Sequence, residues 1–289
     1  MTVRLELATC RAKVIALPLS PSTETDKQFV AAQKDHKSYP SMVGSISHSA
    51  NSTRPNLTHS VNQVARFASD PGPSHFRAVK KIFRYLQGTQ NHGLLYGPSI
   101  FDHKAAKLPT MFAFCDSDWA RCRDTRRSTG SYQIWLYGAP VMFRTYVDKS
   151  VALSTAEAEC RAMSELTKDI LWSRHLVESI LDIQIQNPTS IYTDNQASIS
   201  IASNPVSGKH SKHIELRYHY TRENVKNGLV SIFHVPSAFN RADIGTKPLR
   251  APTFRFLRDR IVHDNIHSSV TLLPEEEEFF KKNPPAPFL

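Results

Sequence analysis

The spacing of apolar side chains predicts helices in the first third of the chain. Between residues 74 and 87 apolar residues recur every three or four positions, which gives a helix one apolar face. Ser74 is the expected N-cap of this helix, and Gly88 is expected to end it. Upstream, two short helical stretches are expected between residues 41 and 69. They are separated at Arg54, because a residue that precedes a proline disfavours the helical conformation.

From residue 111 onward the pattern changes to short apolar runs that are typical of strands. Three such runs come first, a long helix follows, and further strands then alternate with helices. The predicted order is strands 111–116, 129–138 and 139–147, helix 155–181, strand 189–195, helices 196–204 and 213–228, strand 229–237 and helix 239–249. Three antiparallel strands followed by alternating strands and helices predict an α/β fold, with a mixed five-stranded sheet flanked by helices.

Changes in composition divide the chain into four parts. Residues 1–40 are expected to be a poorly structured lead-in, because residues 18–40 are rich in Pro, Ser, Thr, Lys and Asp and have little periodicity. Residues 41–97 form a small, mainly helical segment, and residues 108–250 form the domain that contains the sheet. Residues 251–289 are expected to be a tail that is largely disordered after residue 262, because its end is charged and rich in proline.

The amino-acid composition of the chain indicates which classes of partner to expect. The 289 residues are 40% hydrophobic and 21% charged, as in an ordinary globular protein. With 36 Lys and Arg against 26 Asp and Glu the net charge is +10, which favours polyanionic partners. The four cysteines form no CxxC pair, which disfavours a zinc site or a disulfide framework. Since no run of eighteen apolar residues occurs, we expect no membrane partner. The cysteine usage fits a reducing compartment, so we expect an intracellular location, in a cytoplasmic particle or the nucleus.

Four acidic residues lie where a sheet of this kind places functional groups. Asp116 and Asp194 each follow an apolar strand, Glu159 lies in the first turns of the long helix, and Asp243 lies in the last short helix. Carboxylates crowded together repel one another unless cations hold them. Mg²⁺ prefers oxygen ligands, and two such ions would clamp the attacking and leaving oxygens in phosphodiester cleavage.

Several motifs, in order, resemble one known family. FCDSDWARCRDTRRSTGSY, VALSTAEAEC, IYTDNQASISIASNP, KHIELRYHYTRENVKNG and HVPSAFNRADIGTKPL are similar to successive blocks of the ribonuclease H domain of copia-type retrotransposon Pol polyproteins. Residues 41–89 resemble the thumb and connection region that precedes this domain, so the resemblance reaches from residue 41 to about residue 260. It implies a ribonuclease H-like fold and, as a partner, the remainder of a reverse transcriptase.

The resemblance also implies an activity and its residues. It implies hydrolysis of the RNA strand of RNA–DNA hybrids, leaving a 3′-hydroxyl and a 5′-phosphate. The catalytic and metal-binding residues would be Asp116, Glu159, Asp194 and Asp243, holding two Mg²⁺ ions for which Mn²⁺ may substitute. Asp116 is preferred to Asp118 because it directly follows the apolar run. No polymerase palm is present, so no polymerase activity is expected.

Three readings remain open alongside this one. Arg77, Lys80, Lys81 and Arg84 are either a solvated helix face or a nucleic-acid-binding face. The chain could be a catalytically inactive nucleic-acid-binding remnant, because it departs from the family pattern, for example in the order Gly130-Ser131. An integrase-like nuclease is disfavoured, since its glutamate would follow the second strand aspartate, whereas Glu159 precedes Asp194.

Overall fold

The chain folds into two compact units, each made from two separate stretches. The computed structural model describes residues 38–96, 111–122, 124–136, 138–203, 212–264 and 272–288. The helical unit combines Met1–Leu94 with Lys247–Ser268, and the sheet unit combines Leu95–Thr246 with Ser269–Leu289. Most of the predicted lead-in, residues 1–37, lies outside the described residues.

The helical unit packs short helices around a small aliphatic core. Its elements are α2 (Ser38–Ser52), η2 (Pro55–Leu57), α3 (Thr58–Ala65), α4 (Pro73–Gly88) and α9 (Ala251–Arg258). Ile46, Val64 and Val79 are among the fully buried side chains. Arg54 lies at the break between α2 and η2, as expected for the residue before a proline, and its guanidinium donates hydrogen bonds to Thr89.

Helix α4 has the two faces that its sequence predicts. Val79 and Ile82 are buried in the core of the helical unit. The basic residues Arg77, Lys80, Lys81 and Arg84 are all exposed. The predicted N-cap, Ser74, is wrong: Gly72 is the N-cap and the helix begins at Pro73. The Gly72 N–H donates a 2.7 Å hydrogen bond to His75 Nδ1.

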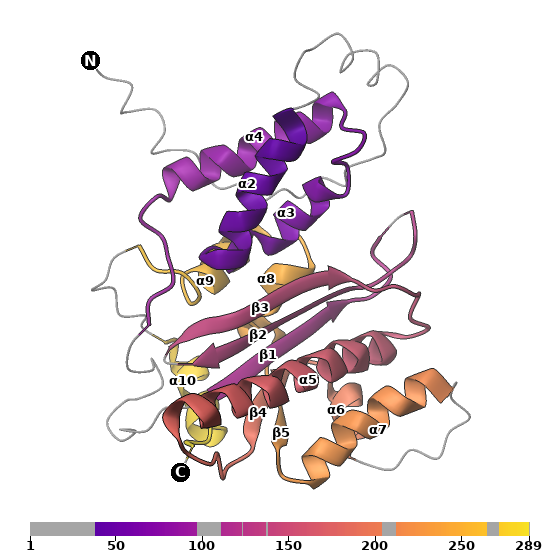
Figure 1. Ribbon diagram of the computed structural model, residues 1–289, viewed down its shortest axis with the longest axis vertical. Helices are drawn as coiled ribbons and strands as arrows, with labels where there is room; N and C mark the ends of the chain where they lie inside the picture. The colour runs from indigo at the N-terminus through magenta and orange to yellow at the C-terminus, as the bar shows by residue number, and fades with distance from the viewer. Residues whose placement is uncertain are drawn as a thin grey trace. The chain divides into compact units, whose positions relative to one another are not determined.

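A mixed five-stranded sheet forms the centre of the sheet unit (Figure 1). Its strands are β1 (Met111–Asp118), β2 (Thr129–Leu136), β3 (Ala139–Val147), β4 (Thr189–Thr193) and β5 (Val230–His234). They lie in the order β3-β2-β1-β4-β5. The pairs β1–β2 and β2–β3 are antiparallel, whereas β1–β4 and β4–β5 are parallel. The predicted ribonuclease H-like sheet, preceded by a helical segment, is confirmed.

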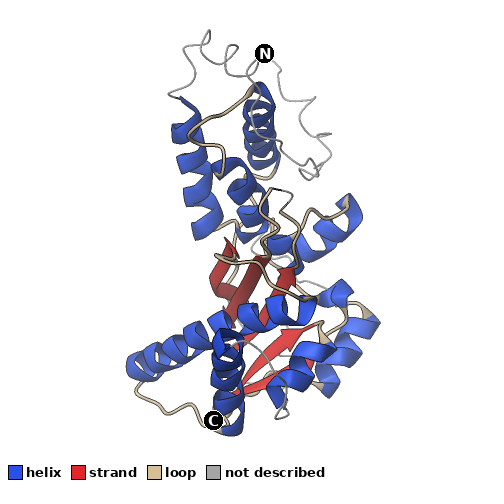
Figure 2. Ribbon diagram, turned by 90° about the vertical axis from the view of Figure 1, so that its right-hand side faces the viewer, coloured by secondary structure: helices blue, strands red, loops and turns tan. Residues whose placement is uncertain are grey.

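Helix α5 (Thr155–Leu181) covers one face of this sheet. Its N-cap is Ser154, whose side-chain oxygen accepts a hydrogen bond from a backbone N–H of the first turn. Leu166 and Ile170 are fully buried and belong to the same aliphatic cluster as Ile134 of β2. The remaining helices of the unit are α6 (Gln196–Ser203), α7 (Lys212–Lys226), η3 (Ser237–Phe239) and α8 (Asp243–Thr246). Figure 2 shows the strands flanked by helices.

The opposite face of the sheet is aromatic and packs against the C-terminal segment, residues 272–288. Phe112, Phe114, Trp135 and Tyr192 contribute rings from the strands. Helix α10 (Pro274–Lys282) lies in this segment, and its Phe279 and Phe280 rings contact the Tyr192 ring at 5.9 and 5.5 Å. The prediction of a largely disordered tail after residue 262 is therefore wrong for residues 272–288, because their aromatic side chains are packed against the sheet.

The same segment is tied to the sheet by hydrogen bonds along its length. Tyr192 Oη donates to Asn283 O at 2.7 Å, and Asn187 Nδ2 donates to Pro287 O at 2.9 Å. Phe288 ends the segment in the aliphatic cluster on the other side of the sheet, with 2% of its surface exposed. Among the described residues, no helix has the length and apolar character needed to cross a membrane.

Candidate metal centre

Two aspartates meet because the strands that carry them are parallel neighbours. Asp116 lies near the end of β1, and Asp194 directly follows β4. The register pairs Phe114 with Tyr192, two residues before each aspartate. Since parallel strands end at the same edge of a sheet, this pairing brings the two carboxylates together, as the sequence predicted.

A third carboxylate reaches the same place from helix α5. Glu159 lies in the second turn of the helix, is 5% exposed, and its Oε1 accepts a 3.2 Å hydrogen bond from the backbone N–H of Ser117. Glu157, the other acid of this motif, points elsewhere: it forms an ion pair with Arg161 and accepts a hydrogen bond from Leu153 N. The preference for Glu159 over Glu157 therefore agrees with the geometry of the helix.

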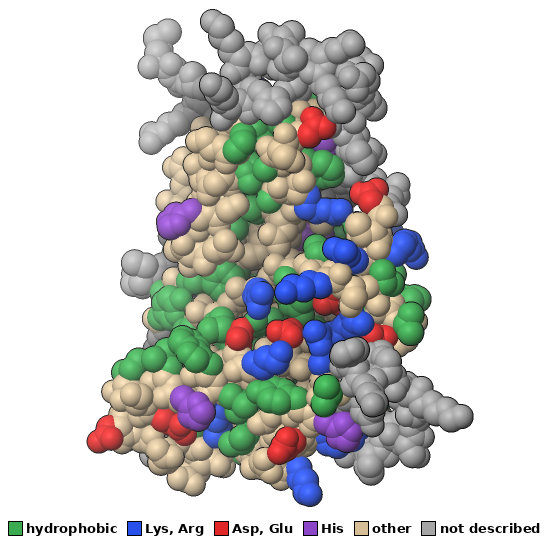
Figure 3. Space-filling model, turned by 45° about the vertical axis from the view of Figure 1, so that its right-hand side comes forward, with side chains coloured by type: hydrophobic (Ala, Val, Ile, Leu, Met, Phe, Trp, Pro, Cys, Tyr) green, Lys and Arg blue, Asp and Glu red, His purple; other side chains and the backbone are tan. Residues whose placement is uncertain are grey.

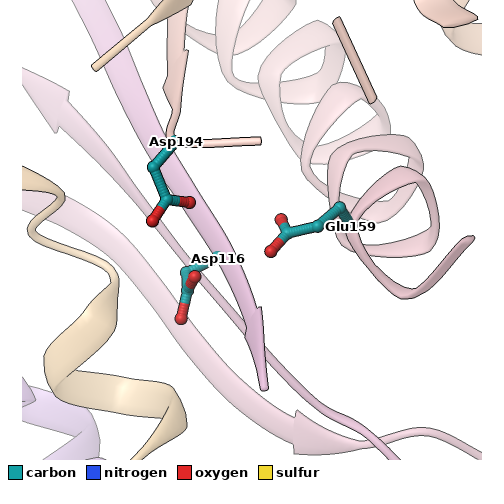
Figure 4. Close-up of side chains that lie close together, drawn as sticks. All are labelled: Asp116, Glu159 and Asp194. Atoms are coloured by element: carbon teal, nitrogen blue, oxygen red, sulfur yellow. The ribbon is translucent and has the colours of Figure 1, made fainter. Parts of the chain in front are cut away.

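The side chains of Asp116, Glu159 and Asp194 lie close together, and Glu159 is directed toward the two aspartates (Figure 4). One carboxylate oxygen from each lies within 4.8 Å of the others. Asp116 and Glu159 are buried and Asp194 is partly exposed, so their negative charges are poorly screened by water. A cluster made only of carboxylate oxygens suits a hard divalent cation such as Mg²⁺, so the residues fit the group that the fold implies.

Next to these carboxylates in the chain lies the buried thiol of Cys115. Burial, and after it the negative charge of Glu159, raises the pKa of Cys115 well above its usual value. The thiol is fully buried between Phe114 and Asp116 in β1 and belongs to the aliphatic cluster under α5. Cys115 therefore stays protonated and acts as an apolar core residue.

Polar side chains from the loop after β5 hold two of the acids. Ser237 Oγ donates a 2.6 Å hydrogen bond to Asp194 Oδ2, and Asn240 Nδ2 lies 3.4 Å from Asp194 Oδ1. Thr246 Oγ1 donates to Asp116 Oδ2. Sequence reasoning missed these three residues, although all of them lie in the HVPSAFNRADIGTKPL motif that it selected for Asp243.

The fourth predicted acid, Asp243, is not part of the group of three. It is the first residue of α8, is 5% exposed, and its N–H donates to Asn240 O at 3.2 Å. Helix α8 packs against β1 and β2, where Gly245 lies close to Ser131. Asp243 is thus carried by the same short helix that holds Asp116 through Thr246.

The predicted nucleic-acid-binding residues belong to the other unit. Arg77, Lys80, Lys81 and Arg84 form the exposed face of α4 in the helical unit. In the sheet unit, Asp118 forms an ion pair with Arg121 at 3.3 Å and is not in the acidic group.

Comparison with known proteins finds similar sequences over most of this chain. The chain is 32% identical over 250 residues to the Retrovirus-related Pol polyprotein from transposon RE1 of Arabidopsis thaliana, covering 86% of this chain and 16% of that one. It is 31% identical over 261 residues to the polyprotein from transposon TNT 1-94 of Nicotiana tabacum, covering 88% and 19%. The chain therefore spans less than a fifth of the length of these relatives. No family model matches it.

Solved structures with a similar arrangement include two with low sequence identity. The foamy viral protease-reverse transcriptase in complex with RNA/DNA hybrid matches 74% of this chain and 27% of its own, with 12% identity and a TM-score of 0.42. LC11-RNase H1, isolated from compost, matches 47% of this chain and 92% of its own, with 14% identity and a TM-score of 0.35.

Proposed function

Since the chain belongs to the copia-type retrotransposon Pol polyproteins, we propose that its sheet unit is a metal-dependent endonuclease that hydrolyses the RNA strand of RNA–DNA hybrids. The observation that carries this proposal is the convergence of Asp116, Glu159 and Asp194, whose carboxylate oxygens lie within 4.8 Å of one another. Carboxylates at this distance repel one another, and a cation held between them would relieve that repulsion. A cation held there would supply what phosphodiester hydrolysis requires, namely activation of the attacking water and stabilisation of the leaving oxygen.

The residues of the site would either bind the metal ions or orient the residues that bind them. When bound, a pair of Mg²⁺ ions would activate the attacking water and stabilise the leaving oxygen. Asp116, Glu159 and Asp194 would hold these ions, with Asp243 as the fourth acid. Oriented carboxylates bind metal better than freely rotating ones, and the hydrogen bonds from Ser237, Asn240 and Thr246 supply that orientation.

Basic surfaces on both units support a nucleic-acid substrate. In the sheet unit Arg121, Arg126, Arg127 and Lys149 are exposed. On the face shown in Figure 3, Lys and Arg side chains lie beside Asp and Glu side chains. In the helical unit the exposed face of α4 carries Arg77, Lys80, Lys81 and Arg84. Such side chains bind phosphates without reading bases, which suits a hybrid duplex that is recognised by its shape and 2′-hydroxyls. The remainder of a reverse transcriptase is the proposed protein partner.

A second candidate function is a nucleic-acid-binding remnant that no longer cuts. The observation that favours it is the place of Asp243 outside the group of three acids. Ser131 stands where the family pattern has glycine, and it lies directly against Gly245, two residues after Asp243. On this reading the protein binds hybrid in a salt-dependent way but does not turn it over.

Cleavage of a labelled hybrid distinguishes these functions. The full chain with Mg²⁺ is expected to cut the RNA strand, and Asp116→Asn or Asp194→Asn is expected to lower the rate at least about a hundredfold, because each removes a metal-ligand charge. Glu165→Gln is the matched control, since Glu165 lies on α5 beyond Glu159 and pairs with Lys168. Binding without cleavage in either Mg²⁺ or Mn²⁺ would establish the remnant, and cleavage by Asp116→Asn at the full rate would refute the assignment of the site.

A further inference from the structure

A fully buried ion pair joins the C-terminal segment to the loop that holds the acidic site. Arg241 Nη2 and Glu276 Oε1 lie 3.4 Å apart, and both side chains are 0% exposed. The Arg241 guanidinium lies over the Trp135 ring at 4.6 Å and over the Phe114 ring at 5.3 Å. A buried ion pair loses hydration that an apolar pair of similar volume would not lose, so stability alone does not account for it.

Arg241 stands in the chain directly beside a residue that touches the site. Its carbonyl oxygen accepts a 3.1 Å hydrogen bond from Gln133 Nε2, which fixes the backbone at this point. The preceding residue, Asn240, donates from Nδ2 to Cys115 O at 3.0 Å and lies 3.4 Å from Asp194 Oδ1. A shift of Arg241 would therefore move the amide group that orients Asp194.

The chain after Arg241 carries two further groups of the site, Asp243 and Thr246. Asp243 follows two residues after Arg241, and its N–H donates to Asn240 O. Thr246 closes α8 and donates to Asp116. The stretch 236–246 thus contacts two of the three converging acids and carries the fourth, and its Arg241 guanidinium lies over the Trp135 and Phe114 rings of the aromatic face.

Glu276 is itself held in place by the segment around it. Phe280, one turn later in α10, contacts the Phe114 ring at 6.5 Å and lies 6.0 Å from the Arg241 guanidinium. Beyond the helix, Asn283 and Pro287 accept hydrogen bonds from Tyr192 and Asn187. The carboxylate that meets Arg241 therefore comes from an element anchored to the sheet at several points.

From this geometry we propose that Glu276 is a positioning residue for the acidic site, acting on Asp194 and Asp243 through Arg241 and Asn240. The C-terminal segment then completes the nuclease unit: it fixes the guanidinium between aromatic rings, and the guanidinium fixes the loop. An effect of Glu276 on metal affinity would rest on the proposed function, whereas an effect of Glu276 on the order of the loop 236–246 would not.

Hydrogen–deuterium exchange of the metal-free full chain tests the loop directly. Glu276→Gln keeps the shape of the side chain and removes its charge, so peptides covering 236–246 are expected to exchange about tenfold faster. The matched control is Glu278→Gln, the same change two residues later on an exposed position of α10, and it is expected to leave the loop unchanged. Equal loop exchange in the two variants would overturn the proposal.

Metal affinity supplies a second readout that a purely structural role would not move. Titration with Mn²⁺, followed by calorimetry, is expected to show about tenfold weaker binding to Glu276→Gln, within the range found for partners of metal ligands. Phe288→Leu, which loosens the far end of the segment, is expected to lower the melting temperature without this loss. A loss of affinity that is equal in Phe288→Leu and Glu276→Gln would reduce Glu276 to a stabilising role and refute the proposal.

A second variant covers a failure to fold, and the absence of metal binding would separate this proposal from the proposed function. Should Glu276→Gln not fold, Glu276→Asp retains the charge but shortens the side chain by about 1.5 Å, and is expected to give an intermediate increase in loop exchange. Should the unmodified chain bind no Mn²⁺, the proposed nuclease function fails, whereas the exchange comparison still decides whether Glu276 positions the loop.

Discussion

The two faces of the central sheet are packed by different physical means. Under α5 the contacts are aliphatic, with Leu166 and Ile170 against residues such as Ile134. The opposite face is aromatic, and it encloses the charged pair Arg241 and Glu276. The first face requires only apolar residues of suitable size. The second requires specific partners, because a buried charge without its partner is strongly unfavourable.

The two faces also support the acidic site in different ways. The aliphatic face presents Glu159 to the site through a rigid helix. The aromatic face connects to the site through the loop 236–246, where Asn240 and Thr246 contact the acids. We therefore expect substitutions under α5 to affect stability, and substitutions on the aromatic face to affect stability and the site together.

The largest expected effect comes from separating the buried charges. Arg241→Met removes the positive charge that faces the buried Glu276 carboxylate and is expected to lower the free energy of unfolding by about 3–5 kcal/mol. The double variant Arg241→Met/Glu276→Leu is expected to be within about 1 kcal/mol of the unmodified chain or more stable, because neither charge is then buried. Urea denaturation followed by tryptophan fluorescence measures this, since Trp119, Trp135 and Trp172 all lie in the sheet unit. A single variant as stable as the double variant would contradict the comparison.

The aliphatic face gives the next largest effect. Leu166→Ala is expected to cost about 3 kcal/mol, from the lost burial and the cavity that remains. Leu176→Ala on the same helix is the control. Its side chain is 42% exposed, and its cost is expected to stay below about 1 kcal/mol. The same fluorescence measurement applies. Equal losses at the two positions would mean that α5 does not pack as a two-sided helix.

A smaller effect is expected where α8 meets the sheet. A Cβ at Gly245 would overlap Ser131 Oγ and lie 2.6 Å from Thr145 Oγ1, so Gly245→Ala is expected to cost about 1–3 kcal/mol. Adding Ser131→Gly removes the nearest obstacle and is expected to recover part of the loss, because the contact with Thr145 Oγ1 remains. The melting temperatures of the single and double variants measure this. No recovery in the double variant would show that the close contact with Ser131 is not the cause.

The elements and the three converging acids could be predicted because their signals are local. An apolar strand that ends in an acid is visible in the sequence, and the parallel pairing of β1 with β4 follows from the order of the elements. The start of α4 was predicted two residues late at its cap, although Pro73 after Gly72 is itself a start signal.

The remainder depends on contacts between distant parts of the chain. Asn240 contacts Cys115 across 125 positions and Thr246 contacts Asp116 across 130, and no periodicity within a loop indicates such partners. Ile180, an apolar residue near the end of α5, is 70% exposed. A helix of 27 residues is about 40 Å long, whereas the 8 residues of β1 span about 26 Å, so the end of α5 projects past the sheet.

The discontinuity of the helical unit has a consequence for how the protein is made. Its last helix, α9, contributes the buried residue Leu257, and the Phe254 ring contacts Tyr85 of α4. Gly93 pairs with His263 in an isolated antiparallel bridge. During translation the ribosome must therefore add the whole sheet-forming stretch, which takes roughly 10–30 s, before helices α2, α3 and α4 can meet α9. Until then the helical unit exposes the apolar surface that α9 will cover.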